Sequence, residues 1–184
     1  MTARSPLRHR GFTIIELMIV LAMVAALTVL AAPGLQNMLA NQRLSSAASD
    51  FMTAAMQARG TALKNNQRVI VQPTAGSGGA WADGYRIFTD VGSLNSTFDS
   101  GTDTVVQTFE ALPSEITITK YTGTNNFFGY EGSGFLAPIG GSANGTWRIS
   151  SSKTDRQKCM IIELSGRARL CDPKLVGTAN CQCS

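Results

Sequence analysis

The chain has 184 residues, of which 43% are hydrophobic, so it is long enough for an apolar N-terminal segment and one domain with a packed core. Its formal charge of +4 arises from 16 basic and 12 acidic residues. Because Arg4, Arg8 and Arg10 fall in residues 1–11, the rest of the chain has 13 basic against 12 acidic residues, which excludes a generally basic protein.

The first predicted element is an apolar helix. No charged residue occurs in the 19 residues from Leu17 to Leu35. As a helix this run is about 28 Å long, close to the thickness of a bilayer's hydrocarbon core. The arginines before it predict a cytoplasmic N-terminus, with everything after the span outside. An ordinary signal peptide does not fit, because its apolar run is shorter. A plain membrane anchor does not explain Glu16, because an unpaired carboxylate costs about 2–3 kcal/mol in the membrane.

The junction before this run carries a specific motif. A short basic leader, Gly11, and then FTIIEL at residues 12–17 resemble the type III signal of type IV pilins and type II secretion pseudopilins. The resemblance implies that prepilin peptidase cuts after Gly11, removes residues 1–11 and methylates the new N-terminal Phe12. It also implies that Glu16 neutralises the Phe12 amine of a neighbouring subunit during assembly. The protein would cross the inner membrane once, with its domain in the periplasm, and would then join other major and minor pilins in the pilus.

The helical pattern continues beyond the apolar run. Small and apolar residues recur at the i, i+3, i+4 and i+7 spacing of an amphipathic helix, at Leu44, Ala47, Ala48, Phe51, Ala55, Ala58 and Ala62. The opposite side is polar, so this half is expected to lie on a globular domain. We therefore assign residues 12–35 to a transmembrane or filament-core half and residues 36–66 to an amphipathic half. Pro33 and Gly34 are expected to interrupt the helix between the two halves.

The remainder, residues 67–184, has the composition of a β-rich region. Short β-branched or aromatic runs occur at residues 68–73, 84–90, 104–112, 115–121, 134–139, 146–150 and 158–164, separated by loops rich in Gly, Ser and Asn. Strands do not alternate with helices as they do in parallel sheets. We expect an α+β fold in which the long N-terminal helix packs on antiparallel β-sheet.

The charges of this region separate along the chain. Residues 81–131 contain two basic and seven acidic side chains, whereas residues 145–174 contain seven basic and three acidic ones. Within the basic part, Ser165 and Gly166 form a predicted two-residue turn, since glycine supplies the positive φ of tight hairpins. Arg167 and Arg169 then point to one face of a strand, about 6.6 Å apart. Two forked guanidinium groups beside a turn can reach neighbouring phosphates.

All four cysteines, Cys159, Cys171, Cys181 and Cys183, lie in the last 26 residues. An even number of cysteines after an export-like N-terminus favours disulfides in an oxidising compartment. A zinc site is the less favoured alternative, because the only histidine is His9 in the leader and Cys159 and Cys171 are twelve residues apart. A bridge between Cys181 and Cys183 would be strained, so each is expected to pair with Cys159 or Cys171.

The sequence offers no catalytic constellation. It has no histidine outside the leader, no Gly-x-Ser-x-Gly and no glycine loop that could hold phosphate at the start of a helix. Asp99 and Asp103 flank a turn that could bind calcium, but an ordinary acidic turn is favoured because the dense oxygen ligands of a calcium loop are missing. We therefore expect a protein that is not an enzyme and that has no cofactor and no metal site.

Three further segments resemble the GspH/FimT/FimU branch of minor pilins: QARGTALKNNQRVIV at 57–71, WADGYRIFTD at 81–90 and SGRARL at 165–170. This resemblance implies a pilin or GspH-like fold and a minor pilin that initiates or caps a type IV pilus. In FimT-type members a C-terminal Gly-Arg-x-Arg motif is associated with DNA binding in natural transformation. The sequence GRAR at residues 166–169 matches that motif.

The resulting hypothesis is a patch that binds double-stranded DNA without sequence specificity. Its members are Gly166, Arg167 and Arg169, with Arg148, Lys153, Arg156 and Lys158 as supporting charge. The alternative for the two hairpin arginines is that they pair with an acidic surface of the next subunit. The alternative for the whole protein is a GspH-like minor pseudopilin of a type II secretion system, with a structural role and no DNA binding.

Overall fold

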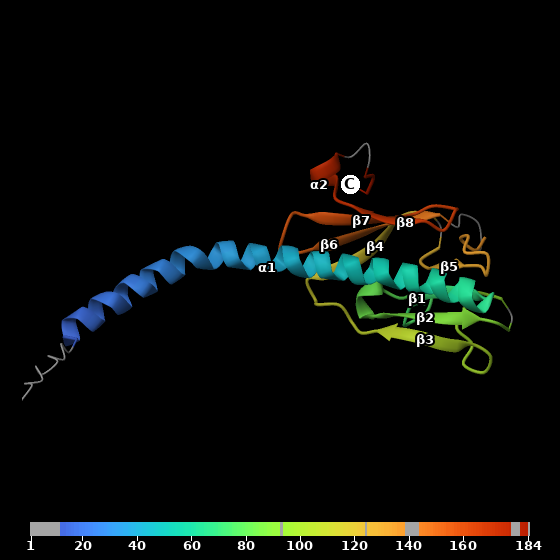
Figure 1. The fold of residues 1–184 in the computed structure, drawn as a ribbon, viewed down its shortest axis with the longest axis horizontal. Coiled ribbons are helices and arrows are strands. Elements are labelled where there is room, and N and C mark those ends of the chain that lie inside the picture. The colour runs from blue at the N-terminus through green and yellow to red at the C-terminus, as the bar shows by residue number, and fades with distance from the viewer. Residues whose placement is uncertain (1–11, 93, 124, 139–143, 178–180, 184) are drawn as a thin grey trace, which may run out of the picture. The chain divides into compact units, whose positions relative to one another are not determined.

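The computed structural model describes residues 12–92, 94–123, 125–138, 144–177 and 181–183, and it describes residues 29–33 as helical backbone only. The chain divides into two compact units, Met1–Met38 and Leu39–Ser184. Helix α1 spans Ile14–Asn65 (Figure 1). The expected interruption at Pro33 and Gly34 is wrong, because the helix runs through both positions without a break. A proline removes one backbone donor from a helix, and a glycine can keep helical dihedral angles, so neither residue has to end it.

In the first unit, the described side chains of α1 are exposed to solvent. Phe12 and Ile14 are 83% and 82% exposed, and the apolar side chains that follow them are exposed as well. The described residues include no helix that is both long and apolar enough to cross a membrane. The assignment of residues 12–35 to a membrane span stays a prediction. The structure does not describe the side chains of residues 29–33 within this range. The leader, residues 1–11 with Gly11, lies outside the described residues altogether.

In the second unit, the later part of α1 forms the centre of the core. The positions expected on its apolar side are all buried: Leu44, Ala47, Ala48, Phe51, Ala55, Ala58 and Ala62. This part of the helix lies between two sheets, and side chains from both sheets join the same hydrophobic cluster (Figure 1). Most helix positions in that cluster are alanines, which let strands approach the helix backbone closely. The amphipathic pattern in the sequence is thereby confirmed.

Two antiparallel four-stranded sheets make up the rest of the second unit. Sheet A has the order β3-β2-β1-β5, with β1 Arg68–Pro73, β2 Tyr85–Asp90, β3 Thr104–Phe109 and β5 Phe128–Tyr130. Sheet B has the order β4-β6-β7-β8, with β4 Ile116–Thr122, β6 Gly145–Ser151, β7 Gln157–Ile162 and β8 Ala168–Cys171. A short 3-10 helix, η1 Trp81–Asp83, precedes β2, and α2 Pro173–Val176 follows β8. The predicted α+β fold with an N-terminal helix on antiparallel sheet is confirmed.

One strand was expected in the wrong place. The described part of the run 134–139 forms no ladder, only a single bridge between Tyr130 and Leu136. Strand β5 lies instead at Phe128–Tyr130, which the sequence pattern placed in a loop. Gly134 explains the difference, because it closes a turn onto Glu131 with a φ of +79°, which lies outside the backbone region of regular strands. The segment after this turn serves as a support for the hairpin between β7 and β8.

Aromatic side chains fill the space between α1 and both sheets. Phe51 from the helix is fully buried, with ring-centroid distances of 4.9 Å to Trp81, 5.5 Å to Tyr85, 5.8 Å to Phe128 and 6.3 Å to Trp147. All four pairs have edge-to-face geometry, which aromatic rings favour. Because Trp147 lies on sheet B and Tyr85 on sheet A, one helix residue holds the two sheets together.

Candidate functional site

The candidate site is the hairpin between β7 and β8. The amide of Glu163 donates to the Arg167 carbonyl at 3.0 Å, and the amide of Gly166 donates to the Glu163 carbonyl at 2.9 Å. These bonds enclose a three-residue loop, Leu164 to Gly166, so the two-residue turn expected at Ser165 and Gly166 is wrong. In such loops a turn is followed by one residue in the left-handed region, and Gly166 has a φ of +77°.

The hairpin loop is fixed against the core rather than free in solvent. A Cβ added to Gly166 would lie 2.1 Å from the Gly134 carbonyl oxygen. Arg59 of α1 donates from Nε to that same oxygen at 2.9 Å and from Nη2 to the Ser165 carbonyl at 3.1 Å. The positioning role of Arg59 escaped the sequence analysis. No sequence pattern indicates it, because the two carbonyls lie 75 and 106 residues further along the chain.

Strand register decides which basic side chains share a surface. Cys159 of β7 is opposite Arg148 of β6, and Ile161 of β7 is opposite Arg169 of β8. Residues on either side of Arg148, such as Trp147, are buried in the core. Side chains alternate along a strand, so Arg148, Cys159, Ile161 and Arg169 lie on the face of sheet B turned away from the core. We call this the outer face of sheet B.

Arg167 and Arg169 lie at the end of the outer face, beside the loop. Arg167 is exposed, and it lies two residues before Arg169, so both occupy the same side. Arg169 is 40% exposed, and its Nε lies 3.7 Å from Oε1 of Glu163 across the hairpin. An exposed pair of this kind is weak and can exchange for a phosphate. The two arginines therefore lie on the same side of the hairpin.

The four supporting residues do not all join them. Arg148 shares the outer face, but its Nε donates to the Cys183 carbonyl at 2.6 Å and its guanidinium lies 4.9 Å from the centre of the Tyr121 ring. Lys158 lies opposite the buried Ile149, hence on the core side, with Nζ 3.2 Å from Oδ2 of Asp172. Lys153 and Arg156 are exposed in the loop before β7. That loop and the arginine hairpin are at opposite ends of β7, about 17 Å apart.

Two disulfides attach the C-terminal tail to this sheet. They join Cys159 to Cys183 and Cys171 to Cys181. Both tail cysteines thus pair upstream, as the sequence predicts. Cys159 and Cys171 are themselves directly opposite on β7 and β8, so the two bridges lie side by side on the outer face. The tail is therefore held on the outer face at Cys159 and Cys171, two strand positions from Arg169.

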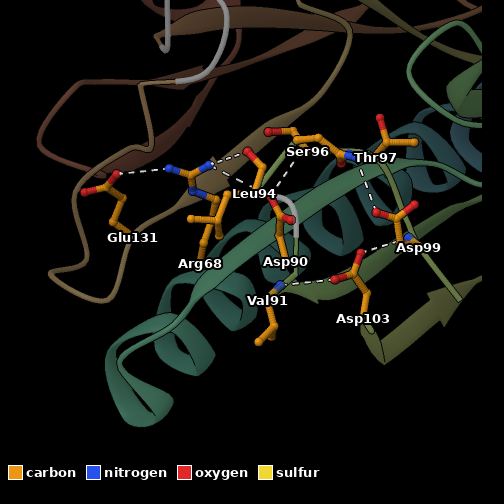
Figure 2. Close-up of polar contacts among 10 residues, drawn as sticks. Arg68, Asp90, Val91, Leu94, Ser96, Thr97, Asp99, Asp103 and Glu131 are labelled. Carbon is orange, nitrogen blue, oxygen red and sulfur yellow. Dashed lines mark hydrogen bonds and ion pairs between the residues drawn. The ribbon is translucent and has the colours of Figure 1, made fainter. Parts of the chain in front are cut away.

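Asp103 stabilises the loop after β2 (Figure 2). The carboxylate of Asp103 accepts the Val91 amide at 3.1 Å with Oδ1 and the Asp99 amide at 2.9 Å with Oδ2. Asp103, one of the two candidate calcium ligands in the sequence, therefore binds backbone amides with both carboxylate oxygens. This use favours the ordinary acidic turn.

Asp90 and Arg68 form a second polar group beside that turn (Figure 2). Asp90 is 1% exposed and accepts the Ser96 amide at 3.0 Å, with Arg68 Nη1 3.9 Å from its Oδ2. Burial raises the pKa of the Asp90 carboxyl above its usual range, against the effects of the Ser96 amide and the Arg68 charge. Arg68 also donates to the Leu94 carbonyl and lies 3.6 Å from Glu131. Several acidic side chains of residues 81–131 therefore make hydrogen bonds or ion pairs within the second unit itself.

At the N-terminus, the structure adds a local interpretation of Glu16. Thr13 precedes the first residue of α1, and its hydroxyl accepts the Glu16 amide at 3.3 Å. Threonine followed three residues later by glutamate is the pattern of a capping box. The carboxylate is also favourable in the first turn, where the helix dipole is positive. Glu16 therefore has a role in the helix start that is separate from any role in assembly.

Comparisons with known proteins identify the fold. The family model described as type II transport protein GspH matches residues 47–166, and the prokaryotic N-terminal methylation motif matches residues 6–32. A comparison with curated proteins gives no match. The type IV minor pilin FimU of Pseudomonas aeruginosa PAO1 is 19% identical in each of two crystal forms. These matches have TM-scores of 0.57 and 0.54, and they cover 71% and 68% of this chain and 89% and 90% of FimU.

A pseudopilin gives a similar match. The minor pseudopilin EpsH of the Vibrio cholerae type 2 secretion system is 13% identical, with a TM-score of 0.52 over 71% of this chain and 98% of EpsH. At these identities the structures show the shared fold alone. The GspH match covers well over half of the chain and ends at Gly166, so it does not include the two hairpin arginines. The methylation motif match covers the Gly11–Phe12 junction and Glu16. The chain therefore belongs to the GspH family, whose members are pilin and pseudopilin subunits that assemble into filaments and are not enzymes.

Proposed function

We propose that this chain is a minor subunit of a type IV pilus that starts the filament or occupies its tip. The observation that carries the proposal is the exposure of the apolar side chains between Phe12 and Thr28, which lie at the start of α1 and inside the segment that matches the methylation motif. Such a helix requires apolar surroundings. The inner membrane supplies them before assembly, with the second unit in the periplasm, and helices of other pilins supply them in the pilus. Prepilin peptidase would cut after Gly11 and methylate Phe12.

The assembly step would use Glu16 as the partner of a neighbouring subunit's Phe12 amine. Glu16 is the only charged residue between Phe12 and Gln42, and a charge at membrane depth is stable when a partner neutralises it. The capping role makes a different demand, since it needs a side-chain oxygen that can accept a hydrogen bond from the Thr13 backbone amide but needs no charge.

Substituting Glu16 by glutamine separates the two roles, because glutamine also serves in a capping box. We expect Glu16→Gln to reach the membrane normally and to enter pili at least about tenfold less, the effect of losing about 1.4 kcal/mol of pairing. Thr13→Ala, which removes the cap and keeps the charge, is the matched control and should assemble nearly normally. Immunoblots of sheared pili and of membranes measure both. Normal incorporation of Glu16→Gln with poor incorporation of Thr13→Ala would assign Glu16 to capping alone.

We further propose that Arg167 and Arg169 bind the phosphates of extracellular double-stranded DNA for uptake in natural transformation. Three features support this: Arg167 is exposed, Gly166 and Arg59 hold the loop in one conformation, and Arg148 adds charge on the same face. Lys158, Lys153 and Arg156 would contribute little, because Lys158 lies on the core side and the other two lie at the far end of β7. Phosphate contacts carry no sequence information, so binding would be non-specific.

Binding of random-sequence duplex DNA by the full chain in detergent, measured by titration at several salt concentrations, tests this proposal. With about two to three phosphates neutralised, log K should fall with log salt at a slope of about −2 to −3. Replacing Arg167 and Arg169 together by glutamine should weaken binding on every DNA sequence and flatten the slope by about one to two. Arg156→Gln is the matched control and should change little. If the double variant binds DNA as strongly as the parent, or if Arg156→Gln weakens binding as much as the double variant does, the proposal fails. The two hairpin arginines would then be assigned to a contact with a neighbouring subunit.

The second candidate is a structural pseudopilin of a type II secretion system without DNA binding. The GspH family model and the fold match to EpsH favour it. Deletion of the gene distinguishes the candidates, since loss of surface pili supports the first and loss of protein secretion with intact pili supports the second.

A further inference from the structure

The four cysteines bring their sulfur atoms into one small volume on the outer face of sheet B. The Sγ atoms of Cys159, Cys171 and Cys181 lie within 4.8 Å of one another, and Cys183 is bonded to Cys159. We propose that, once a dithiol or phosphine reductant has opened both disulfides, the four thiolates bind one zinc ion in a tetrahedral site. Zinc–sulfur bonds of about 2.3 Å place tetrahedral sulfurs about 3.8 Å apart. The two sulfurs of each opened disulfide must therefore move apart, while the unbonded sulfurs among Cys159, Cys171 and Cys181 need to approach by no more than about 1 Å.

The backbone holds two of the ligands in place without any disulfide. Cys159 and Cys171 are opposite each other in the β7–β8 ladder, which also includes the pair of Met160 and Leu170. Met160 is fully buried in the core, so the ladder is fixed by packing as well as by hydrogen bonds. The other two ligands, Cys181 and Cys183, are separated by one residue in the tail. Two ligands fixed on neighbouring strands and two on a tail that the opened disulfides no longer hold together allow zinc to set its own geometry.

The surroundings of the cluster suit a buried zinc thiolate. Cys159, Cys181 and Cys183 are fully buried, so water would have little access to the metal. A tetrathiolate site has a net charge of −2, and Arg148 lies beside it, donating to the Cys183 carbonyl at 2.6 Å. A contact of this kind both orients a ligand residue and offsets negative charge.

The chemistry balances in two steps. Each disulfide accepts two electrons and two protons and becomes two thiols. A dithiol supplies both the electrons and the protons and is oxidised to its own disulfide, whereas a phosphine supplies the electrons and takes the oxygen of a water molecule, which supplies the two protons, to become the phosphine oxide. Zinc then displaces the thiol protons to solvent as it binds the four sulfurs. The tail would be attached to sheet B in both states, by disulfides when oxidised and by the metal when reduced. A chain that has not yet been oxidised would thus still hold its tail on the outer face of sheet B.

Metal titration of the full chain in detergent tests the inference. After reduction by a phosphine and removal of metals, cobalt should bind in about a one-to-one ratio and give the visible absorption of tetrahedral cobalt thiolate, and zinc should displace it. The disulfide-bonded protein should give no such absorption. Zinc should also raise the unfolding temperature of the reduced protein, since a ligand that binds the folded state stabilises it.

Two variants make the result specific. Replacing Cys159 and Cys183 by serine leaves the Cys171–Cys181 disulfide to fold the tail, and after reduction this variant should bind zinc at least about 100-fold more weakly. His9→Gln is the control for the leader and should bind as the parent does. The inference is overturned if the reduced parent binds less than about a tenth of an equivalent, if the serine variant binds equally, or if His9→Gln abolishes binding.

Discussion

Replacing Gly166 by alanine should lower the free energy of unfolding of the second unit by about 3 kcal/mol or more. Two costs combine at this position. The φ of +77° is a strained conformation for alanine, and the new methyl group would lie 2.1 Å from the Gly134 carbonyl oxygen. That oxygen belongs to the backbone and also accepts a hydrogen bond from Arg59, so it cannot move away without a further loss. Chemical denaturation of the full chain, followed by near-ultraviolet circular dichroism, measures the change.

Gly76→Ala is the matched control for this prediction. Gly76 has a φ of +91°, and nothing lies within 4 Å of its added Cβ. It therefore experiences backbone strain alone, which costs about 1 kcal/mol. The difference between the two variants measures the close contact between the hairpin loop and Gly134. If Gly166→Ala is as mild as Gly76→Ala, the loop is not fixed against the core as described. DNA binding should also weaken in Gly166→Ala, because the loop that orients Arg167 would have to shift.

Replacing Phe51 by alanine should cost about 4 kcal/mol, the usual effect of truncating a fully buried aromatic side chain. The ring contacts aromatic residues of both sheets, so its loss leaves a cavity that neither sheet can fill alone. Unfolding experiments on the full chain measure the loss.

Met56→Ala is the control for the same helix. Met56 is 55% exposed, and its truncation should change stability by no more than about 0.5 kcal/mol. Phe51→Leu, which keeps most of the volume, should lie between the two variants. A change of less than about 1 kcal/mol in Phe51→Ala would contradict the central position of this ring in the core.

Much of the fold could be predicted because its signals are local. The spacing of Ala47, Ala48, Phe51 and Ala55 specifies a buried helix face whatever it packs against, and the structure buries that face. Six of the eight strands lie in predicted β runs, and β8 lies at the predicted alternation after Gly166. The cysteine pattern predicted that Cys181 and Cys183 each pair upstream, because a bridge between them would be strained, but it left open which partner each takes.

The sequence-based predictions are wrong where contacts between residues far apart in the chain determine the structure. A run rich in apolar residues after Gly134 has the composition of a strand, but its turn and its contact with Leu164 assign it to the support of the hairpin. The predicted DNA-binding patch includes Lys158 because it is close in sequence to other basic residues. Side chains alternate between the two faces along β7, however, and this alternation places Lys158 on the core side. The role of Arg59 depends on carbonyls 75 and 106 residues away in the chain, a distance over which sequence spacing gives no information.

The central claim is that this GspH-family chain is processed as a prepilin and built into a filament, and mass spectrometry of its N-terminus in sheared filaments tests that claim most directly. The account predicts a chain that begins at Phe12, carries one methyl group on its amine and is found in the filament fraction. A chain cleaved near residues 31–32, as a secreted protein would be, or an uncleaved chain that still enters filaments, would contradict it.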